Sequence, residues 1–320
     1  MKILANDGID ATGKRLLEEM GCTVLTEKVN QDVLANFINE NGVEGLLVRS
    51  ATTARKDLLD ACAGLRFIGR GGVGIDNIDK AYAESKGIKV FNTPGAGSQS
   101  VAELVMSLMF AAARFTYKAG HEMPQKGSES FDALKKSYAK GIEVRGKTLG
   151  ILGFGKIGRS LASYALGCGM NVITFDKFKP ENTIVQVSVG PHKTFPYEVP
   201  FVSVDQVLME SDFISLHVPK QENGEAVIGE DEFKKLKKGV VLINTARGGV
   251  INEKALKANL DSGHVRFVAL DVFENEPTPD QGILGHPMVI ATPHIGASTA
   301  EAQERIGIEI AEKVKEIIQA

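Results

Sequence analysis

The chain carries a glycine-rich turn, Gly153-Phe154-Gly155-Lys156-Ile157-Gly158, directly after an apolar run and at the start of an amphipathic segment. In this setting the first glycine permits a tight turn, the second lets the backbone approach a pyrophosphate, and the third lets helix and strand pack closely. The free N–H groups at the start of the helix also attract phosphates. The motif therefore predicts a dinucleotide site; the alternative is a glycine turn without a ligand.

An acidic side chain stands where such a site needs one. The next apolar run, 171–175, leads into Asp176, 18 residues after Gly158. A carboxylate there accepts hydrogen bonds from both ribose hydroxyls and repels a 2′-phosphate, so NAD is favoured over NADP. Lys177 and Lys179 lie close by in the sequence and weaken this preference without reversing it.

Three more polar residues follow apolar runs in the same half of the chain: Arg247, Glu276 and His294. Arginine can hold a carboxylate and polarise a carbonyl, and histidine can take or return a hydroxyl proton near neutral pH. A carboxylate beside the imidazole would fix its tautomer and raise its pKa. Because open α/β sheets bind ligands at the carboxyl ends of their strands, the trio suits hydride chemistry on a 2-hydroxy acid. The alternative is three unrelated surface residues.

Short apolar runs alternate with helical patterns, and these elements must position the polar groups. The alternation predicts right-handed βαβ units and parallel sheets. In the first ninety residues we expect strands at 2–6, 45–48, 66–69 and 89–91, and helices at 10–20, 31–41, 55–62 and 78–85. Residues 92–97 then break the pattern like a hinge, and a capping box of Ser100 and Glu103 opens a long apolar helix to about Tyr117.

The second half repeats the alternation after a polar stretch at 121–143. Strands are expected at 148–152, 171–175, 213–218, 240–244, 266–270 and 288–291, with helices at 156–166, 230–237 and 253–260. Between them, residues 183–189 and 199–204 alternate like the strands of a local hairpin around 190–192. A capping box of Ser298 and Glu301 opens a closing helix. The predicted fold class is α/β, with doubly wound parallel sheets.

Composition narrows the class of protein. A length of 320 residues suggests two domains. With 37 Lys+Arg against 40 Asp+Glu the net charge is −3, so no global basic field points to nucleic acid. Three separated cysteines indicate neither a disulfide framework nor a zinc cluster, and no metal is expected. Without a signal sequence or a span-length apolar run, we expect a cytoplasmic protein that does not enter membranes.

Four motifs together resemble the signatures of NAD-dependent D-2-hydroxyacid dehydrogenases: GFGKIG, NTARGG, DVFENEP and PHIGAST. Several long motifs in the right order are more specific than any one of them, and the similarity covers roughly residues 40–320. Within the family, the phosphoglycerate dehydrogenases are the most similar branch. The segments 47–52 and 68–77 and the residues after His294 carry that likeness.

The resemblance implies a role for each matching residue. His294 is the expected acid/base, Glu276 its partner and Arg247 the substrate clamp. Substrate binding is also implied for Arg49, Arg70, Val73 and Gly74, the two arginines holding phosphate and carboxylate. Cofactor binding is implied for Gly153, Gly155, Lys156, Ile157, Gly158, Asp176, Val218, Thr245, Ala246, Arg247, Asp271, His294, Gly296 and Ala297. In this set Asp271 is expected to bind the carboxamide of nicotinamide.

The family's architecture implies a discontinuous chain layout. A flavodoxin-like substrate-binding domain of residues 1–94 and 294–320 would enclose an inserted Rossmann domain of residues 95–293 that binds NAD. The inserted domain is expected to form a homodimer, with the long helix from Ser100 as a contributor. The chain is expected to be a short form without the serine-sensing regulatory domain of longer relatives.

Three functions are compatible with the sequence. The leading one, implied by the resemblance, is oxidation of 3-phospho-D-glycerate by NAD⁺ to 3-phosphohydroxypyruvate, the first step of L-serine biosynthesis, with closure of the two domains to exclude water. The second is a reductase for glyoxylate, hydroxypyruvate or another small 2-keto acid; the basic pair Arg49 and Arg70 argues against it, because an uncharged tail needs no second guanidinium. The third, from another class, is a NAD-sensing scaffold.

Overall fold

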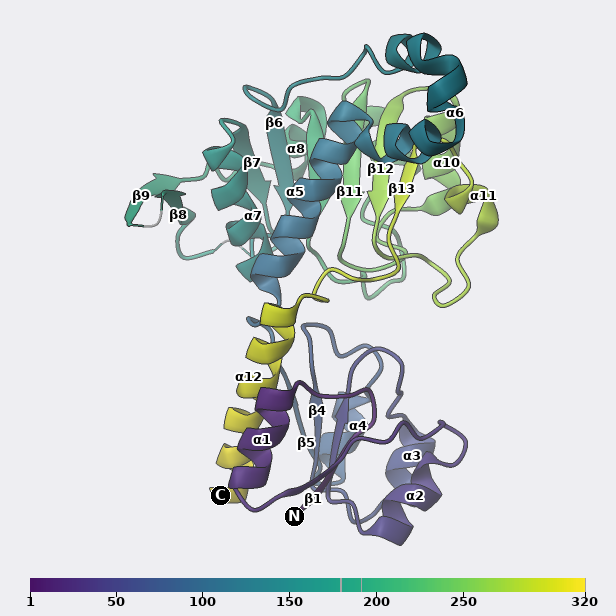
Figure 1. Cartoon of the computed structure of the whole chain (residues 1–320). Coiled ribbons are helices and arrows are strands. Elements are labelled where there is room, and N and C mark those ends of the chain that lie inside the picture. Colours follow the sequence, from purple (N-terminus) through teal and green to yellow (C-terminus); the bar gives the residue numbers. More distant parts are fainter. Residues whose placement is uncertain (179, 191, 320) are drawn as a thin grey trace. The chain divides into compact units, whose positions relative to one another are not determined.

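The computed structural model describes residues 1–178, 180–190 and 192–319, and the chain folds into two compact units. Unit 1 consists of Met1–Ser100 together with the chain from Ala297 onward, and unit 2 consists of Val101–Gly296. Figure 1 shows each unit as a sheet flanked by helices. One helix, α5 (Ser98–Arg114), begins in unit 1 and continues in unit 2.

Unit 1 is built on a five-stranded parallel sheet in the order β2-β1-β3-β4-β5. This is the flavodoxin-like order, in which ligands bind near the strand ends where the winding reverses. Its strands are β1 (Lys2–Ala5), β2 (Thr23–Leu25), β3 (Gly45–Val48), β4 (Phe67–Arg70) and β5 (Lys89–Asn92). Its helices are α1 (Ala11–Glu19), α2 (Leu34–Asn41), α3 (Lys56–Ala61), α4 (Lys80–Ser85) and α12 (Ala300–Gln319).

Apolar side chains on both faces of this sheet explain its continuous apolar strands. Helices α2, α3 and α4 share one buried cluster with β1, β3 and β4, and α1 and α12 share another. Gly13 of α1 faces Gly307 of α12 so closely that a Cβ on Gly13 would lie 2.5 Å from the Cα of Gly307. A side chain at either glycine would push the two helices apart.

Unit 2 contains a six-stranded parallel sheet in the order β13-β12-β11-β10-β6-β7. The winding reverses between β6 and β10, as in dinucleotide-binding sheets. Its strands are β6 (Thr148–Leu152), β7 (Asn171–Phe175), β10 (Phe213–Leu216), β11 (Val240–Asn244), β12 (Val265–Leu270) and β13 (Val289–Ala291). Its further helices are α6 (Thr116–Ser137), α7 (Lys156–Gly167), α8 (Val204–Glu210), α9 (Glu230–Lys235), α10 (Glu253–Asp261) and α11 (Gln281–Leu284).

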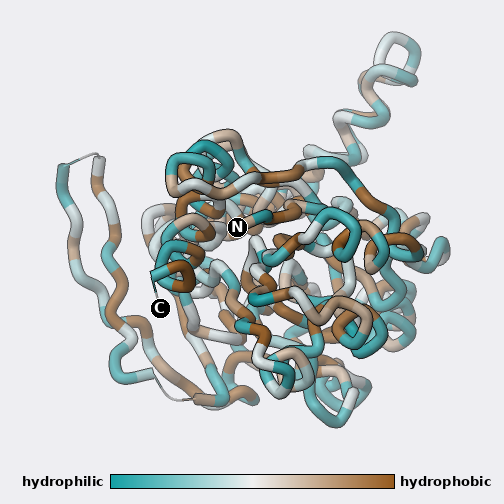
Figure 2. The backbone as a smooth tube through the Cα atoms, turned by 90° about the horizontal axis from the view of Figure 1, so that it is seen from below, coloured by the Kyte–Doolittle hydropathy of each residue, from teal (hydrophilic) through white to brown (hydrophobic). Residues whose placement is uncertain are grey.

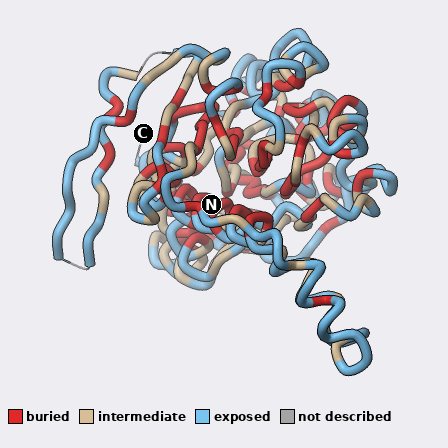
Figure 3. Tube along the Cα trace, turned by 90° about the horizontal axis from the view of Figure 1, so that it is seen from above, coloured by how far each residue is buried: buried red, intermediate tan, exposed pale blue. Residues whose placement is uncertain are grey.

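An antiparallel hairpin of β8 (Ile184–Val189) and β9 (Lys193–Glu198) lies beside α7. Its first strand agrees with the alternation at 183–189. The second expected strand, 199–204, is wrong: the returning strand is 193–198, which pairs with β8 directly after a short turn, and α8 begins at Val204. Pro191, which the sequence placed in the turn of the hairpin, lies outside the described residues. In Figure 3 buried residues follow the strands of the large sheets, while the hairpin and α6 are exposed along most of their length. Figure 2 shows apolar residues along the hairpin. Val189 of β8 and Phe195 of β9 are large apolar side chains that are more than half exposed.

The long buried strands agree with the sequence to within one or two residues, and other elements differ. The stretch 121–143, expected to be polar connection, lies largely in helix α6. The predicted cap at Ser100 is wrong: α5 already begins at Ser98, and the Ser100 hydroxyl bonds to that of Thr299 at 2.7 Å. The closing helix begins one residue later than expected, because Thr299 accepts from the N–H of Ala302. Strand β2 and helices α8 and α11 were not expected.

Two absences hold for the described residues. No helix among them is long and apolar enough to cross a membrane. In the same part of the chain, no group of three or more His, Cys, Asp or Glu side chains is placed to hold a metal ion.

Candidate active site

The glycine turn after β6 has a geometry that other residues cannot adopt without strain. Gly153 has φ +98°, and a Cβ there would lie 2.4 Å from the carbonyl oxygen of His217. A Cβ on Gly158 would lie 2.3 Å from the oxygen of Gly153, so helix α7 packs directly on the turn. Gly155 precedes α7 with no side chain to cap the helix, which leaves its first N–H groups available to a phosphate. Lys156 and Ile157 form the first turn of that helix.

Asp176 lies at the end of β7, next to the glycine turn. One carboxylate oxygen accepts from the N–H of Phe154 at 2.7 Å, and the other accepts from the N–H of Phe178 at 3.0 Å. Asp176 therefore fixes the turn, and each oxygen keeps a lone pair for a ribose hydroxyl. Lys179, the more distant of the two lysines that the sequence placed nearby, lies outside the described residues.

A half-buried histidine follows the next strand across the reversal. His217 follows β10, and its Nε2 lies 2.9 Å from the Ser215 hydroxyl. Burial lowers the pKa of His217 to about 4, so its imidazole is neutral at physiological pH. Val218, which follows it, contacts the position that a Gly153 side chain would occupy. The place of Val218 beside a bound dinucleotide stays a prediction.

His294 and Glu276, 18 residues apart in sequence, are in direct contact. The His294 Nδ1 lies 2.9 Å from a Glu276 oxygen, and the other Glu276 oxygen accepts from the N–H of Phe273 at 3.0 Å. Burial acts to raise the pKa of Glu276, but these hydrogen bonds and the charges of His294 and Arg247 hold it below its ordinary value. Glu276 is therefore an anion at neutral pH, and its partner nitrogen on His294 carries a proton.

Asp271 at the end of β12 anchors the segment that carries His294. Its buried carboxylate accepts from the hydroxyl of Thr292 at 2.7 Å and from the N–H groups of Ile295 and Gly296 at 2.8 and 2.9 Å. These bonds lie on both sides of His294, whose backbone has the unusual φ of +56°. Asp271 thus holds a catalytic candidate in a conformation that the chain alone disfavours.

Arg247 lies in a short loop after β11, which is the neighbour of β12 in the sheet. Asn244 folds this loop: its amide donates to the carbonyl of Arg247 at 2.9 Å, and its oxygen accepts from the N–H of Ala246 at 3.0 Å. Arg247 is near enough for its charge to lower the pKa of Glu276. In the same loop the hydroxyl of Thr245 is buried without a hydrogen-bond partner among the described residues. Unit 2 thus brings Arg247, Glu276 and His294 together at the ends of adjacent strands.

Arg49 and Arg70 lie together in unit 1. They stand at the ends of the paired strands β3 and β4, where Val48 is opposite Arg70. The Nε of Arg70 donates to the carbonyl of Arg49 at 3.3 Å. Val73, which is 44% exposed, and Gly74 follow β4; the Asn92 amide donates to the carbonyl of Val73.

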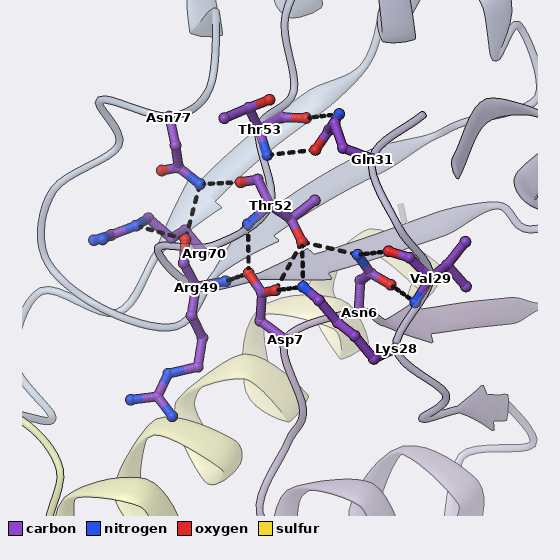
Figure 4. A network of polar contacts seen from close by, with 10 residues as sticks. All are labelled: Asn6, Asp7, Lys28, Val29, Gln31, Arg49, Thr52, Thr53, Arg70 and Asn77. Atoms are coloured by element: carbon purple, nitrogen blue, oxygen red, sulfur yellow. Dashed lines mark hydrogen bonds and ion pairs between the residues drawn. The ribbon is translucent and has the colours of Figure 1, made fainter. Parts of the chain in front are cut away.

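The segment that carries Arg49 is held by the polar network in Figure 4. Asp7 accepts from the N–H groups of Arg49 and Thr52 at 2.7 and 3.0 Å, and from Lys28 at 2.5 Å. Burial acts to raise the pKa of Asp7, but the hydrogen bonds it accepts, that of Lys28 foremost, lower it overall. The Asn77 amide donates to the carbonyls of Arg49 and Thr52 from the other side, at 2.8 and 2.6 Å.

Sequence reasoning did not find the residues that hold these loops. Asp7, Asn77 and Asn244 were not among the expected site residues, and neither were Glu253 and Glu274, described below. Position relative to the strand ends was the available signal for two of them: Asp7 is the second residue after β1, and Asn244 is the last residue of β11. Nothing in the local sequence indicates that Asn77 or Glu253 would bind a distant loop.

A dinucleotide-binding sheet with a histidine–carboxylate pair and an arginine at its strand ends defines an NAD-dependent dehydrogenase. The family model described as "D-isomer specific 2-hydroxyacid dehydrogenase, NAD binding domain" matches residues 106–296. The chain belongs to this family of D-isomer specific 2-hydroxyacid dehydrogenases.

Individual relatives carry different names. The hydroxypyruvate reductase of Thermotoga maritima is 44% identical over 98% of this chain and 97% of its own length. The D-3-phosphoglycerate dehydrogenase of Methanocaldococcus jannaschii is 40% identical over the whole chain, which spans only 58% of that relative's length. A solved structure of a glyoxylate reductase from Paecilomyes thermophila is 29% identical and matches with a TM-score of 0.82, over 98% of this chain and 94% of that one.

Proposed function

We propose that His294 is the acid/base of the dehydrogenase reaction and that Glu276 and Arg247 assist it. The observation that carries this proposal is the 2.9 Å contact of His294 Nδ1 with Glu276. Since Nδ1 donates to the carboxylate, Nε2 has a free lone pair to take the proton of a substrate hydroxyl. Glu276 then stabilises the imidazolium, and Arg247 binds the substrate carboxylate and polarises the carbonyl that forms at C2.

The cofactor is NAD, and the residues described above fit it. The glycine turn and the start of α7 would hold the pyrophosphate, and Asp176 the ribose. When bound, NAD⁺ would supply the acceptor for the hydride of the substrate C2. His294 takes the O–H proton of the same carbon. The expected contact of Asp271 with the carboxamide stays a proposal; the Asp271 oxygen bonded to Gly296 has one lone pair left for it.

For the substrate we propose 3-phospho-D-glycerate, oxidised to 3-phosphohydroxypyruvate at the entry to serine synthesis. Support comes from Arg49 and Arg70 at the ends of adjacent strands, two guanidinium groups that suit a phosphate in addition to the carboxylate assigned to Arg247. Val73 and Gly74 are proposed to line the same part of the substrate site. The phosphoglycerate dehydrogenase from Methanocaldococcus jannaschii, 40% identical, supports the same choice.

A second candidate is a reductase of hydroxypyruvate or glyoxylate. The observation in its favour is the Thermotoga maritima relative, which matches this chain over 97% of its own length at 44% identity. The chemistry at His294 would be the same in the reducing direction, so only the recognition of the substrate tail separates the two candidates.

The experiment is a panel of 2-hydroxy acids oxidised by NAD⁺, read as NADH absorbance: 3-phospho-D-glycerate, D-glycerate, D-lactate and glycolate. The proposal predicts the highest kcat/KM for the phosphorylated acid. Faster turnover of D-glycerate or glycolate supports the second candidate and overturns the first. If NADH binds but no member of the panel turns over, the NAD-sensing scaffold is favoured.

We also propose a homodimer formed through unit 2. Phe110 on α5 and Tyr117, Met123 and Phe131 on α6 are 41–57% exposed, which is unusual for a set of large apolar side chains along successive helices. Burial of such residues against a second copy would favour association. Light scattering should then give twice the chain mass of 34.3 kDa, and Phe131→Glu should shift the equilibrium towards monomer.

A further inference from the structure

Two carboxylates outside the groups assigned above are bound to each other's backbone. Glu253, the first residue of α10, accepts from the N–H of Glu274 at 2.8 Å, and Glu274 accepts from the N–H of Glu253 at 2.9 Å. Glu253 is only 8% exposed. Burial, together with the charges of Glu274 and Asp280, raises the pKa of Glu253 above its ordinary value. A buried carboxylate facing two other acids is costly, so its position calls for an explanation.

Support of its own helix does not explain Glu253. Helix α10 already has a cap, because the side chain of Asn252 accepts from the N–H of Ala255 at 2.8 Å. An exposed acid in the first turn would serve the helix dipole equally well. The Glu253 carboxylate instead reaches the loop 273–276, which follows the sheet after β12.

The peptide between Phe273 and Glu274 is held from two sides. Its N–H binds Glu253, and its carbonyl oxygen faces Gly248 so closely that a Cβ on Gly248 would lie 1.6 Å from it. Gly248 directly follows Arg247. The loop of Arg247 and the loop of Glu276 therefore meet at this one peptide.

From that peptide the contacts lead directly to the reacting groups. The N–H of Phe273 donates to one oxygen of Glu276, and the other oxygen of Glu276 bonds His294. Glu276 lies two residues after Glu274, so a shift of the 273–274 peptide moves the carboxylate that orients the imidazole. A displacement of about 1 Å at a reacting group can cost roughly a hundredfold in rate.

We propose that Glu253 is a positioning residue for the reaction: through the Glu274 peptide it fixes Glu276, and through Glu276 it fixes His294. The inference rests on the acid/base role proposed for Glu276 and His294. It adds a buried carboxylate, and its reciprocal partner Glu274, to the groups on which turnover depends, and both act through Glu276.

The test compares two variants of Glu253 with NADH and hydroxypyruvate as probes. Glu253→Met keeps the length of the side chain and removes the acceptor, and we expect kcat to fall roughly 10- to 100-fold. Glu253→Gln keeps an oxygen that accepts from Glu274, and kcat should stay within about threefold of the parent. The dissociation constant of NADH, read by fluorescence, should change less than about twofold in both, because the glycine turn is untouched.

A matched control comes from α9. Glu232 accepts from the N–H of Gly229 at 3.0 Å at a helix start of the same unit, so its hydrogen bond supports its own helix and not a catalytic loop. Glu232→Met should therefore leave kcat unchanged. An equal loss of kcat in Glu232→Met and Glu253→Met would mean general destabilisation and would overturn the proposal.

The double variant Glu253→Met with Glu276→Gln separates positioning from mere structural support. If Glu253 acts through Glu276, the double variant loses little beyond Glu276→Gln alone. The inference is refuted if the losses of kcat in the two single variants add fully in the double variant, or if Glu253→Met leaves kcat unchanged. In both cases a loss of kcat in Glu276→Gln alone would still support the proposed function. An active Glu276→Gln refutes both the inference and the proposed function. If Glu253→Met does not fold, Glu274→Ala replaces it as the test. This variant changes an exposed side chain and removes the hydrogen bond from the N–H of Glu253 to the Glu274 carboxylate, and kcat should fall about three- to tenfold.

Discussion

At the scale of single residues, the site combines a mobile proton with a rigid frame. His294 has a left-handed backbone, which costs about 1 kcal/mol or more for a residue with a side chain. Three hydrogen bonds to Asp271 and one to Glu276 offset that cost. The imidazole is thereby fixed in orientation while its Nε2 stays available to a substrate.

The first prediction concerns this imidazole. His294→Gln should lower kcat by roughly 10²- to 10⁴-fold, because glutamine cannot take a proton from the substrate hydroxyl. NADH affinity should change little. His192, an exposed histidine near the turn of the hairpin, provides the control His192→Gln, which should match the parent enzyme. Turnover of His294→Gln within tenfold of the parent would mean that another group is the base.

Residue types and strand ends were enough to predict that Arg247, Glu276 and His294 belong together, since parallel strands bring their carboxyl ends to one edge. The hydrogen bonds that hold these residues in place could not be predicted from the sequence. Asp271 joins residues 21 to 25 positions away, and Glu253 joins a residue 21 positions away. Such bonds depend on the path of each loop, which periodicity does not encode.

At the scale of elements, buried helices and strands were easier to predict from the sequence than exposed ones. Strands such as β6 and β11 are apolar on both faces, because helices cover the sheet on each side, and their bounds were predicted without error. Helix α6 buries only Leu134 among its described residues, so its sequence shows no apolar stripe to find. Strand β2, three residues long at the sheet edge, is too short to give a pattern.

A prediction at this scale concerns the end of β7. Asp176→Asn keeps an acceptor for the N–H of Phe154 and removes the negative charge. We expect kcat/KM with NADPH relative to NADH to rise at least about tenfold, because a like charge near the 2′-phosphate is removed. Glu181→Gln, an exposed acid after β7, is the control. No change in the NADPH/NADH ratio would show that Asp176 does not select the cofactor.

Another prediction concerns the turn after β1. Because the folded-state pKa of Asp7 is lowered below 3.8, its stabilising effect is complete above that pH and is lost as pH falls through the lowered value. Asp7→Asn should lower the free energy of unfolding at pH 7 by about 1–3 kcal/mol and so lower the thermal midpoint, because the Lys28 ammonium and the Thr52 hydroxyl then face an amide NH₂ that cannot accept from them. The difference from the parent should shrink near pH 3. Circular dichroism at several pH values measures it, with Asp32→Asn, an exposed acid, as control.

A gap of constant size between the Asp7→Asn and parent midpoints from pH 7 to pH 3 would contradict the role of the ionised carboxylate. The expected convergence would instead identify Asp7 as the charged centre of the network in Figure 4. That network holds the segment of Arg49 through backbone atoms.

At the scale of the whole molecule, a net charge of −3 has to be reconciled with anionic ligands. The proposed solution is local: the uncapped start of α7 for the pyrophosphate, Arg247 for a carboxylate, and Arg49 with Arg70 for a phosphate. One relative is named for a phosphorylated acid and another for an unphosphorylated one. We propose that the two arginines of unit 1 determine which of these substrates the chain prefers.

The most direct test of that choice is the ratio of kcat/KM for 3-phosphohydroxypyruvate to kcat/KM for hydroxypyruvate, measured with NADH on the intact enzyme. Charge-assisted bonds to the phosphate predict a ratio above about ten, falling towards one when Arg49 and Arg70 are both replaced by glutamine. A parent ratio of one or less would contradict the assignment and identify a reductase of unphosphorylated 2-keto acids.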